Sequence, residues 1–240
     1  MHRAAAVILL SLLLAACAIQ PATEPVDVLL LGEQHDAPSH QEQHRQAVQA
    51  LADQGALAAL ALEMAEQGRS TAGLARDATP AAVQAALQWN DKAWPWAAYG
   101  PAVLAAVRAG VPVLGANLPR SSMRTAMGDA TLDRLLSPAA LQAQQTEIRS
   151  GHCGLLPETQ ILPMTRIQLA RDRTMAQVLA QAAVPGKTVV LLAGAGHVEP
   201  ALGVPQHLSA TLRVRAQRWP AQPPQKDYCE ELRRQMAPAK

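Results

Sequence analysis

The stretch Val28-Leu-Leu-Leu-Gly-Glu-Gln-His-Asp36 joins a short apolar run to two carboxylates and an imidazole. A short apolar run that ends at glycine is typical of a buried strand in a parallel sheet. Open α/β folds bind their ligands beyond the carboxyl ends of such strands. A second apolar run, 188–192, ends in the same way and is followed by Gly194-Ala-Gly-His197. The two stretches together predict a polar site at the carboxyl edge of an α/β sheet.

The rest of the chain alternates predicted strands with predicted helices. Apolar runs predict strands at 26–31, 57–62, 111–114 and 188–192, and an alternating segment at 211–216 predicts a fifth strand at an edge. The helical period predicts helices at 38–54, 80–89, 101–109, 137–149 and 158–183. Thr79 is the expected N-cap of the second helix, with Pro80 at its first position. The predicted fold class is α/β, with a mostly parallel central sheet flanked by helices, in a single domain with a helical insertion.

The N-terminal segment has the order of a bacterial export signal. A short charged head precedes the apolar stretch Ala4–Leu14, which is too short to span a membrane. Leu14-Ala-Ala-Cys17 resembles a lipobox, so we expect a signal peptide at 1–16, lipidation of Cys17, and a tether at 17–25. The alternative is a plain Ala-x-Ala cleavage site beside a cysteine. An α/β domain at 26–218 and a tail at 219–240 follow, and the expected location is the bacterial cell envelope, at the outer membrane.

Composition narrows the classes of function. Hydrophobic residues make up 49% of the chain but aromatic residues only 2%, and phenylalanine is absent. A formal net charge of +2, with 17% charged residues, provides no basic stripe of the kind that binds nucleic acid. Apart from Cys17 the chain contains Cys153 and Cys229, which either form a disulfide or remain two free thiols.

Four side chains closely follow predicted strands and are candidates for one shared site: Glu33, His35, Glu63 and His197. Asn117 also follows a strand and is expected to hold the adjacent loop. Carboxylates and imidazoles in one crevice bind a divalent metal ion or act as general acids and bases. The alternative is that the two glutamates only accept hydrogen bonds from nearby backbone.

Two known hydrolase motifs are missing from the chain. His40 and His44 have the spacing of a zincin pair, but Gln41 replaces the glutamate that H-E-x-x-H requires. We therefore expect His44 to lie on a solvated helix face. The G-x-S-x-G nucleophile elbow is absent as well.

These motifs together resemble the ChaN-like haem-binding lipoproteins, an outlying family of the superfamily that contains Tiki proteases, TraB proteins and erythromycin esterases. The resemblance rests on the order of short motifs along nearly the whole mature chain: the lipobox, Leu-Leu-Gly-Glu-Gln-His-Asp, Ala-Leu-Glu-Met at strand two, Tyr99-Gly-Pro, Val111-Pro-Val-Leu-Gly-Ala-Asn-Leu-Pro-Arg120, His152-Cys-Gly, Gln168-Leu-Ala-Arg-Asp, and Ala-Gly-Ala-Gly-His-Val-Glu199.

The resemblance implies a lipid-anchored protein of haem and iron uptake without catalysis of its own. It implies a homodimer with haem between the subunits, and a haem-uptake receptor as partner. Tyr99 is the expected iron ligand, with Tyr228 or a histidine as the alternative. His152 and Arg120 are expected to support the ligand, and His40 and Lys92 to bind the haem propionates. The superfamily also implies an alternative, a metal-dependent hydrolase or protease that holds a divalent ion at Glu33, His35, Glu63 and His197.

Overall fold

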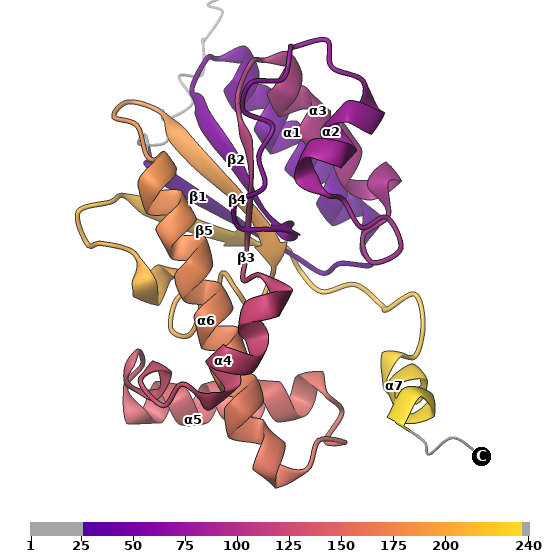
Figure 1. Ribbon diagram of the computed structural model, residues 1–240, viewed down its shortest axis with the longest axis vertical. Helices are drawn as coiled ribbons and strands as arrows, with labels where there is room; N and C mark the ends of the chain where they lie inside the picture. Colours follow the sequence, from indigo (N-terminus) through magenta and orange to yellow (C-terminus); the bar gives the residue numbers. More distant parts are fainter. Residues whose placement is uncertain (1–25, 237–240) are drawn as a thin grey trace, which may run out of the picture.

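The computed structural model describes residues 26–236, which form a five-stranded sheet with every strand parallel (Figure 1). The strands are β1 (Val28–Glu33), β2 (Leu57–Glu66), β3 (Val113–Asn117), β4 (Thr188–Gly194) and β5 (Val214–Arg218), in the spatial order β3-β2-β4-β1-β5. The helices are α1 (Pro38–Asp53), α2 (Pro80–Leu87), α3 (Trp96–Arg108), α4 (Met123–Gly128), α5 (Pro138–Gly151), α6 (Glu158–Ala182) and α7 (Tyr228–Met236). Short 3-10 turns lie at Arg120–Ser122, Leu132–Arg134 and Val204–His207. The α/β class with a parallel sheet is confirmed.

Successive residues of the central strands face two different cores. Leu31 and Leu60 pack with side chains of α1, α2 and α3, whereas Leu30 and Ala61 pack with Met175 of α6. Figure 1 shows the same division, with α1, α2 and α3 grouped together and α6 running apart from them. Burial on both faces explains why the strands read as continuous apolar runs.

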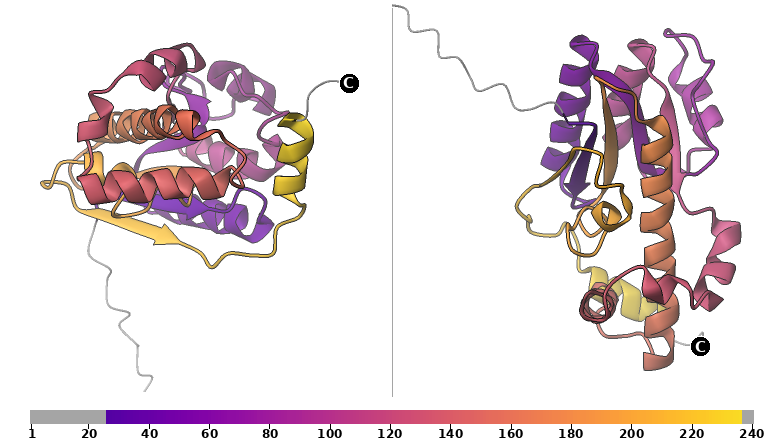
Figure 2. Two further views of the ribbon diagram at one scale, coloured as in Figure 1. Left: turned by 90° about the horizontal axis from the view of Figure 1, so that it is seen from below. Right: turned by 90° about the vertical axis from the view of Figure 1, so that its left-hand side faces the viewer.

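The helical insertion extends beyond the carboxyl ends of the strands. At about 1.5 Å per residue, the 25 residues of α6 span roughly 37 Å, which is longer than the sheet that the helix covers. Its first half packs against α4 and α5 around a small core that includes Leu132 and Leu169. In Figure 2, α4, α5 and this part of α6 project as one group past the sheet.

The strands β1 to β4 all run further toward their carboxyl ends than the sequence predicted, and in β1, β2 and β3 this changes the position of the polar residues. β1 ends at Glu33, β2 at Glu66 and β3 at Asn117, so that Glu33, Glu63 and Asn117 are strand residues instead of loop residues. The expected limits assumed that a strand stops where its apolar run stops. Here the ladder continues because Glu33 pairs with Gly194 of β4 and Glu66 with Asn117.

Helix α3 also differs from expectation. α3 begins at Trp96, five residues before the predicted start, and contains Pro101 in its interior. By contrast, Thr79 is the N-cap of α2 as predicted, since its side chain accepts a hydrogen bond from the Ala82 backbone at 3.2 Å. The predicted strand 211–216 is observed as β5, displaced toward the C-terminus.

The tail folds back across the domain and ends in α7. A disulfide joins Cys229 of α7 to Cys153 at the end of α5, which decides between the two alternatives for this pair. Gln222 and Gln225 add hydrogen bonds to Gln34 and Asp36 in the loop after β1. None of the helices within 26–236 is long and apolar enough to cross a membrane. The predicted signal peptide, Cys17 and the tether lie outside the described residues.

Candidate functional site

Glu33 lies at the end of β1 and is enclosed by polar side chains from three elements. Its Oε1 accepts a hydrogen bond from the Tyr99 hydroxyl of α3 at 2.6 Å and lies 2.7 Å from His35 Nδ1. Its Oε2 accepts from Gln41 Nε2 of α1 at 2.9 Å and lies 3.4 Å from His44 Nδ1. Because the carboxylate is buried, these partners replace the water that would otherwise solvate it.

Glu63 of β2 forms a second buried acidic position. Its Oε2 accepts the Gly194 backbone N–H at 2.7 Å, and its Oε1 lies 3.3 Å from His197 Nε2. His197 Nδ1 in turn lies 2.5 Å from Oδ1 of Asp172, a fully buried residue of α6. The imidazole of His197 is therefore held between two carboxylates.

Glu63, His197 and Asp172 form a buried trio whose members shift one another's pKa values. Burial alone would lower the pKa of His197, but Glu63 and Asp172 outweigh it and raise that pKa to about 10. Burial raises the pKa of Asp172 to about 6. Burial would raise the pKa of Glu63, but the charge and hydrogen bond of His197, the charge of His35 and the Gly194 hydrogen bond together hold that pKa below its usual 4.5. At neutral pH the trio contains an imidazolium between two carboxylates.

His35 connects the two acidic positions. Its Nδ1 lies against Glu33 and its Nε2 is 3.8 Å from Glu63 Oε2. Burial would lower the pKa of His35, yet the hydrogen bond with Glu33 and the charge of Glu63 raise it above 6.5. A Cβ at Gly194 would lie 2.8 Å from His35 Nε2. Glycine at this position therefore makes room for the imidazole.

The structure thus brings the four predicted residues Glu33, His35, Glu63 and His197 together at one edge of the sheet. The pairing of Glu33 with Gly194 explains the convergence, since it places β1 and β4 side by side with their ends level. Asn117 joins them from β3, where its Nδ2 donates to the backbone oxygen of Glu63 at 2.8 Å. Within residues 26–236, no group of three or more His, Cys, Asp or Glu side chains is arranged to hold a metal ion.

A cavity of about 640 Å³ opens next to His35 and Tyr99. Its size is within the roughly 300–1,000 Å³ typical of small-molecule and cofactor sites. Trp94 packs edge-on against His35, with ring centroids 4.8 Å apart. The wall consists of residues from α1, from the loop and helix at 92–101, and from the tail: His35, Asp36, Pro38, Gln41, Glu42, Arg45, Lys92, Ala93, Trp94, Pro95, Ala97, Ala98, Tyr99, Pro101, Gln225, Lys226 and Tyr228.

The residues predicted to bind haem are distributed unevenly around this cavity. Lys92 and Tyr99 line it, but Tyr99 is only 2% exposed. Burial and the negative charge of Glu33 raise the pKa of the Tyr99 hydroxyl far above 10. Iron ligation by Tyr99 would require this hydroxyl to leave Glu33 and to lose its proton, because the ligand atom is a phenolate oxygen.

The other predicted haem residues do not line this cavity. His40 is buried, accepts a hydrogen bond from the Gln34 backbone at 3.0 Å and packs near Trp219. His152 lies beside the disulfide, with its Nδ1 2.8 Å from the Ile148 oxygen. Arg120 lines a different cavity. His40 in particular is only 2% exposed, so little of its surface can meet a propionate.

The sequence did not predict the positions of three residues that contact the two buried glutamates or His197. His44 was expected on a solvated face but is 1% exposed, because Trp219 from beyond β5 covers it at a centroid distance of 5.1 Å. Asp172 and Gln41 were not proposed as site residues. Asp172 is the one acidic residue within the apolar side of α6, and this feature was a usable signal.

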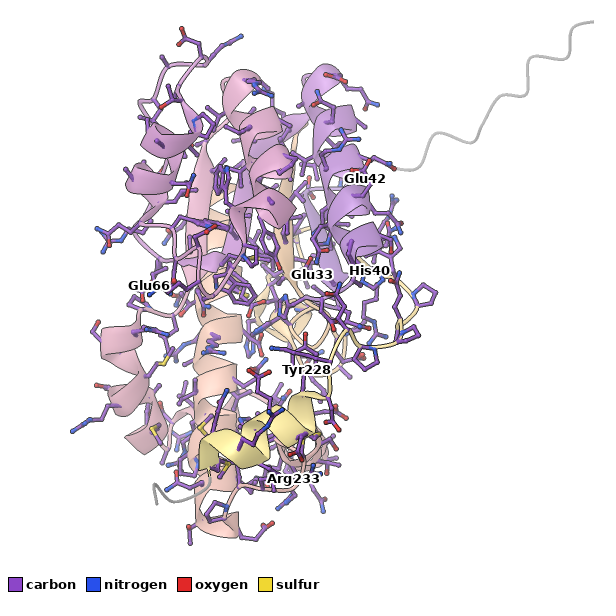
Figure 3. All side chains as sticks on the ribbon, turned by 90° about the vertical axis from the view of Figure 1, so that its right-hand side faces the viewer. Glu33, His40, Glu42, Glu66, Tyr228 and Arg233 are labelled. Carbon is purple, nitrogen blue, oxygen red and sulfur yellow. A yellow bond between two sulfur atoms is a disulfide. The ribbon has the colours of Figure 1, made fainter. Side chains whose placement is uncertain are left out.

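Tyr228 begins α7 and is 45% exposed at the rim of the cavity. Figure 3 shows Glu33 and His40 near the lower ends of β1 and α1, with Tyr228 below them on the tail. The tail thus completes the wall of a cavity whose other side is formed by the loop after β1, by α1 and by the segment 92–101. The fold and site define an α/β protein with a buried histidine–carboxylate cluster beside a cofactor-sized cavity.

Comparison with known proteins identifies the family. The chain belongs to the family described as "Haem-binding uptake, Tiki superfamily, ChaN", which it matches over residues 21–208. It is similar to a solved structure of Campylobacter jejuni ChaN with cofacial haem, at 25% identity and a TM-score of 0.65, covering 81% of each chain. It is more distantly similar to the type III effector HopBA1, at 17% identity and a TM-score of 0.39 over 71% of this chain and 67% of that one, a likeness too low to support an argument. A search of the curated proteins found no significant match.

Proposed function

We propose that this protein binds haem in the cavity beside His35 and Trp94. The observation that carries the proposal is the coincidence of membership in a haem-binding family with a cavity of about 640 Å³ at the expected edge of the sheet. Trp94 offers an aromatic surface for the porphyrin, and Lys92 offers positive charge for a propionate. Arg45 and Lys226 also line the cavity, and they are paired with Glu42 and Glu231.

We propose Tyr228 as the iron ligand. Haem iron accepts a tyrosine phenolate in known proteins, and this chain contains only two tyrosines. The Tyr99 hydroxyl donates a hydrogen bond to the buried carboxylate of Glu33, whereas Tyr228 is accessible at the cavity rim. Burial and Asp36 raise the pKa of Tyr228, so ferric iron must supply the charge that favours the anion.

A hemin titration of the full-length protein in detergent, followed by absorption spectroscopy, tests both statements. Tyr228→Phe should remove the ferric–phenolate charge-transfer band, and Tyr99→Phe, the matched control with the same atom deleted, should leave it. The reverse result would identify Tyr99 as the ligand, and an unchanged band in both variants would point to a histidine. Failure of the wild type to bind hemin would refute the haem function.

We further propose that the protein works in haem or iron uptake as a non-catalytic lipoprotein of the cell envelope, acting with a haem-uptake receptor. Leu14-Ala-Ala-Cys17 supports the lipid anchor. The cofacial haem of the Campylobacter jejuni protein supports a homodimer that encloses haem between its subunits. Light scattering of the protein with and without hemin measures the subunit number. A monomer in both states would contradict the dimer.

A metal-dependent hydrolase remains the second candidate function. The observation in its favour is the close approach of Glu33, His35, Glu63 and His197 to one another, although these side chains are not arranged to hold a metal ion within residues 26–236. Metal analysis of the purified protein separates the two functions. A stoichiometric divalent ion that is lost in Glu33→Ala and His197→Ala would support the hydrolase, and its absence together with tight hemin binding would support the haem function.

A further inference from the structure

A second cavity, of about 450 Å³, lies beside the ends of β2 and β3 and contains three arginines. Arg69 follows β2, Arg120 begins the turn after β3, and Arg171 belongs to α6. Across residues 26–236, none of these guanidinium groups forms an ion pair or a hydrogen bond with another side chain. These three cations outnumber the two carboxylates of the lining, Glu63 and Glu66, so the cavity has a positive potential.

The two carboxylates of the cavity offset only part of this positive charge. Glu63 is already held by His197, and Glu66 accepts a hydrogen bond from the Arg120 backbone at 3.1 Å. Figure 3 shows Glu66 and His40 on opposite sides of Glu33, so the second cavity lies across the site from α1. With one carboxylate neutralised by an imidazolium, the lining keeps a net positive charge.

Two buried polar atoms add an independent observation. Nε of Arg171 and Oδ1 of Asn117 are buried, and neither has a hydrogen-bond partner among the residues that the structure describes. Both residues line this cavity. Buried polar groups in proteins are almost always paired. An unpaired buried donor and acceptor therefore indicate a position that a ligand's polar groups complete.

The remaining lining is partly apolar. Leu87, Trp94 and Met123 contribute to the wall, and Trp94 also lines the first cavity, so the two cavities meet at this side chain. A ligand of mixed character, with anionic oxygens at one end and an apolar body, fits this combination.

We propose that the second cavity binds the anionic oxygens of an organic ligand, carboxylate or phosphate, through Arg69, Arg120 and Arg171. Guanidinium groups match both anions with paired, charge-assisted hydrogen bonds. The anion comes either from the propionates of haem that extends past Trp94, or from a separate small molecule. The site stands on the unpaired arginines and does not require the proposed haem function.

Calorimetric titration of the full-length protein in detergent with citrate and with inorganic phosphate, without haem, tests the site directly. Arg120→Gln and Arg171→Gln should each weaken binding by about tenfold or more, the factor expected for loss of a hydrogen bond to a charged group. Arg124→Gln, an exposed arginine of α4 outside the cavity lining, is the control and should change nothing. Arg120→Lys, which keeps the charge at an exposed position, should retain part of the affinity.

Preloading with hemin distinguishes the two sources of the anion. Propionates in this cavity would block citrate, and Arg120→Gln would then weaken hemin itself. A separate ligand would bind together with hemin. Circular dichroism verifies that the two glutamine variants are folded. The proposal would be overturned if each ligand, citrate, phosphate or hemin, bound to both variants with the same affinity as to the wild type. A wild type that binds citrate but no hemin would refute the haem function alone.

Discussion

Glu63→Gln removes one negative charge from the buried trio and leaves the side chain nearly the same size. Glu63 uses both oxygens, one toward the Gly194 N–H and one toward His197 Nε2. Glutamine has only one oxygen, so its amide group must face one of these donors. The variant therefore loses an ion pair and a buried hydrogen bond together.

The size of the effect follows from His197. Raising its pKa from 6.5 to about 10 corresponds to about 5 kcal/mol of stabilisation at 1.36 kcal/mol per pKa unit, shared between Glu63 and Asp172. Glu63 is the stronger of the two charges that act on the imidazole. We expect Glu63→Gln to lower the free energy of unfolding by about 3 kcal/mol at pH 7, in line with the loss of one partner from a buried pair.

The pH dependence provides a sharper test. A raised histidine pKa stabilises the fold fully below pH 6.5, and this stabilisation is lost as pH rises through about 10. The lowered pKa of Glu63 contributes stability above pH 4.5 that is lost in acid. The difference in the free energy of unfolding between wild type and Glu63→Gln should thus be largest near pH 5 to 6.5 and should become smaller toward pH 10.

Urea denaturation followed by circular dichroism at several pH values measures this difference. Glu66→Gln, the same change further along β2 at a less buried position, is the control and should cost less than about 1 kcal/mol. The reasoning would be refuted if Glu63→Gln lowered the free energy of unfolding by less than about 1 kcal/mol at pH 7. It would also be refuted if the loss were equal at pH 6 and above pH 10, because His197 would then not be an imidazolium held by Glu63 and Asp172.

Three further predictions concern the tail, the sheet and the anchor. The Cys153–Cys229 disulfide spans 76 residues of sequence, so Cys229→Ser should lower the free energy of unfolding by about 4 kcal/mol in urea; a loss below about 1 kcal/mol would contradict this. A Cβ at Gly115 would lie 2.0 Å from the Glu66 backbone oxygen, so Gly115→Ala should cost at least about 2 kcal/mol by thermal denaturation, whereas Gly128→Ala, with open space around it, should not. Cys17→Ala should move the protein from the membrane fraction to the soluble fraction on immunoblots, and unchanged fractionation would disprove the anchor.

The sequence determined the fold class and the edge of the sheet that holds the site. Apolar runs such as Val28–Leu31 have one stable place in a soluble protein, a strand that is buried on both faces, and alternation with helices makes that sheet parallel. Parallel strands end at the same edge, so the positions of Glu33 and His197 after their apolar runs were enough to predict that they meet. Local capping was equally predictable, because Thr79 acts within its own turn.

The tertiary structure decided what each polar side chain contacts. His44 and Tyr99 are buried because Trp219 and Glu33, distant in sequence, lie against them. Asp172 faces His197 because α6 crosses the ends of β2 and β4. The disulfide forms because the end of α5 lies next to α7 in the folded chain. The same packing determines which tail residues line the first cavity. Periodicity and capping are properties of neighbouring residues, whereas burial, pairing and pKa depend on long-range packing, which no local pattern encodes.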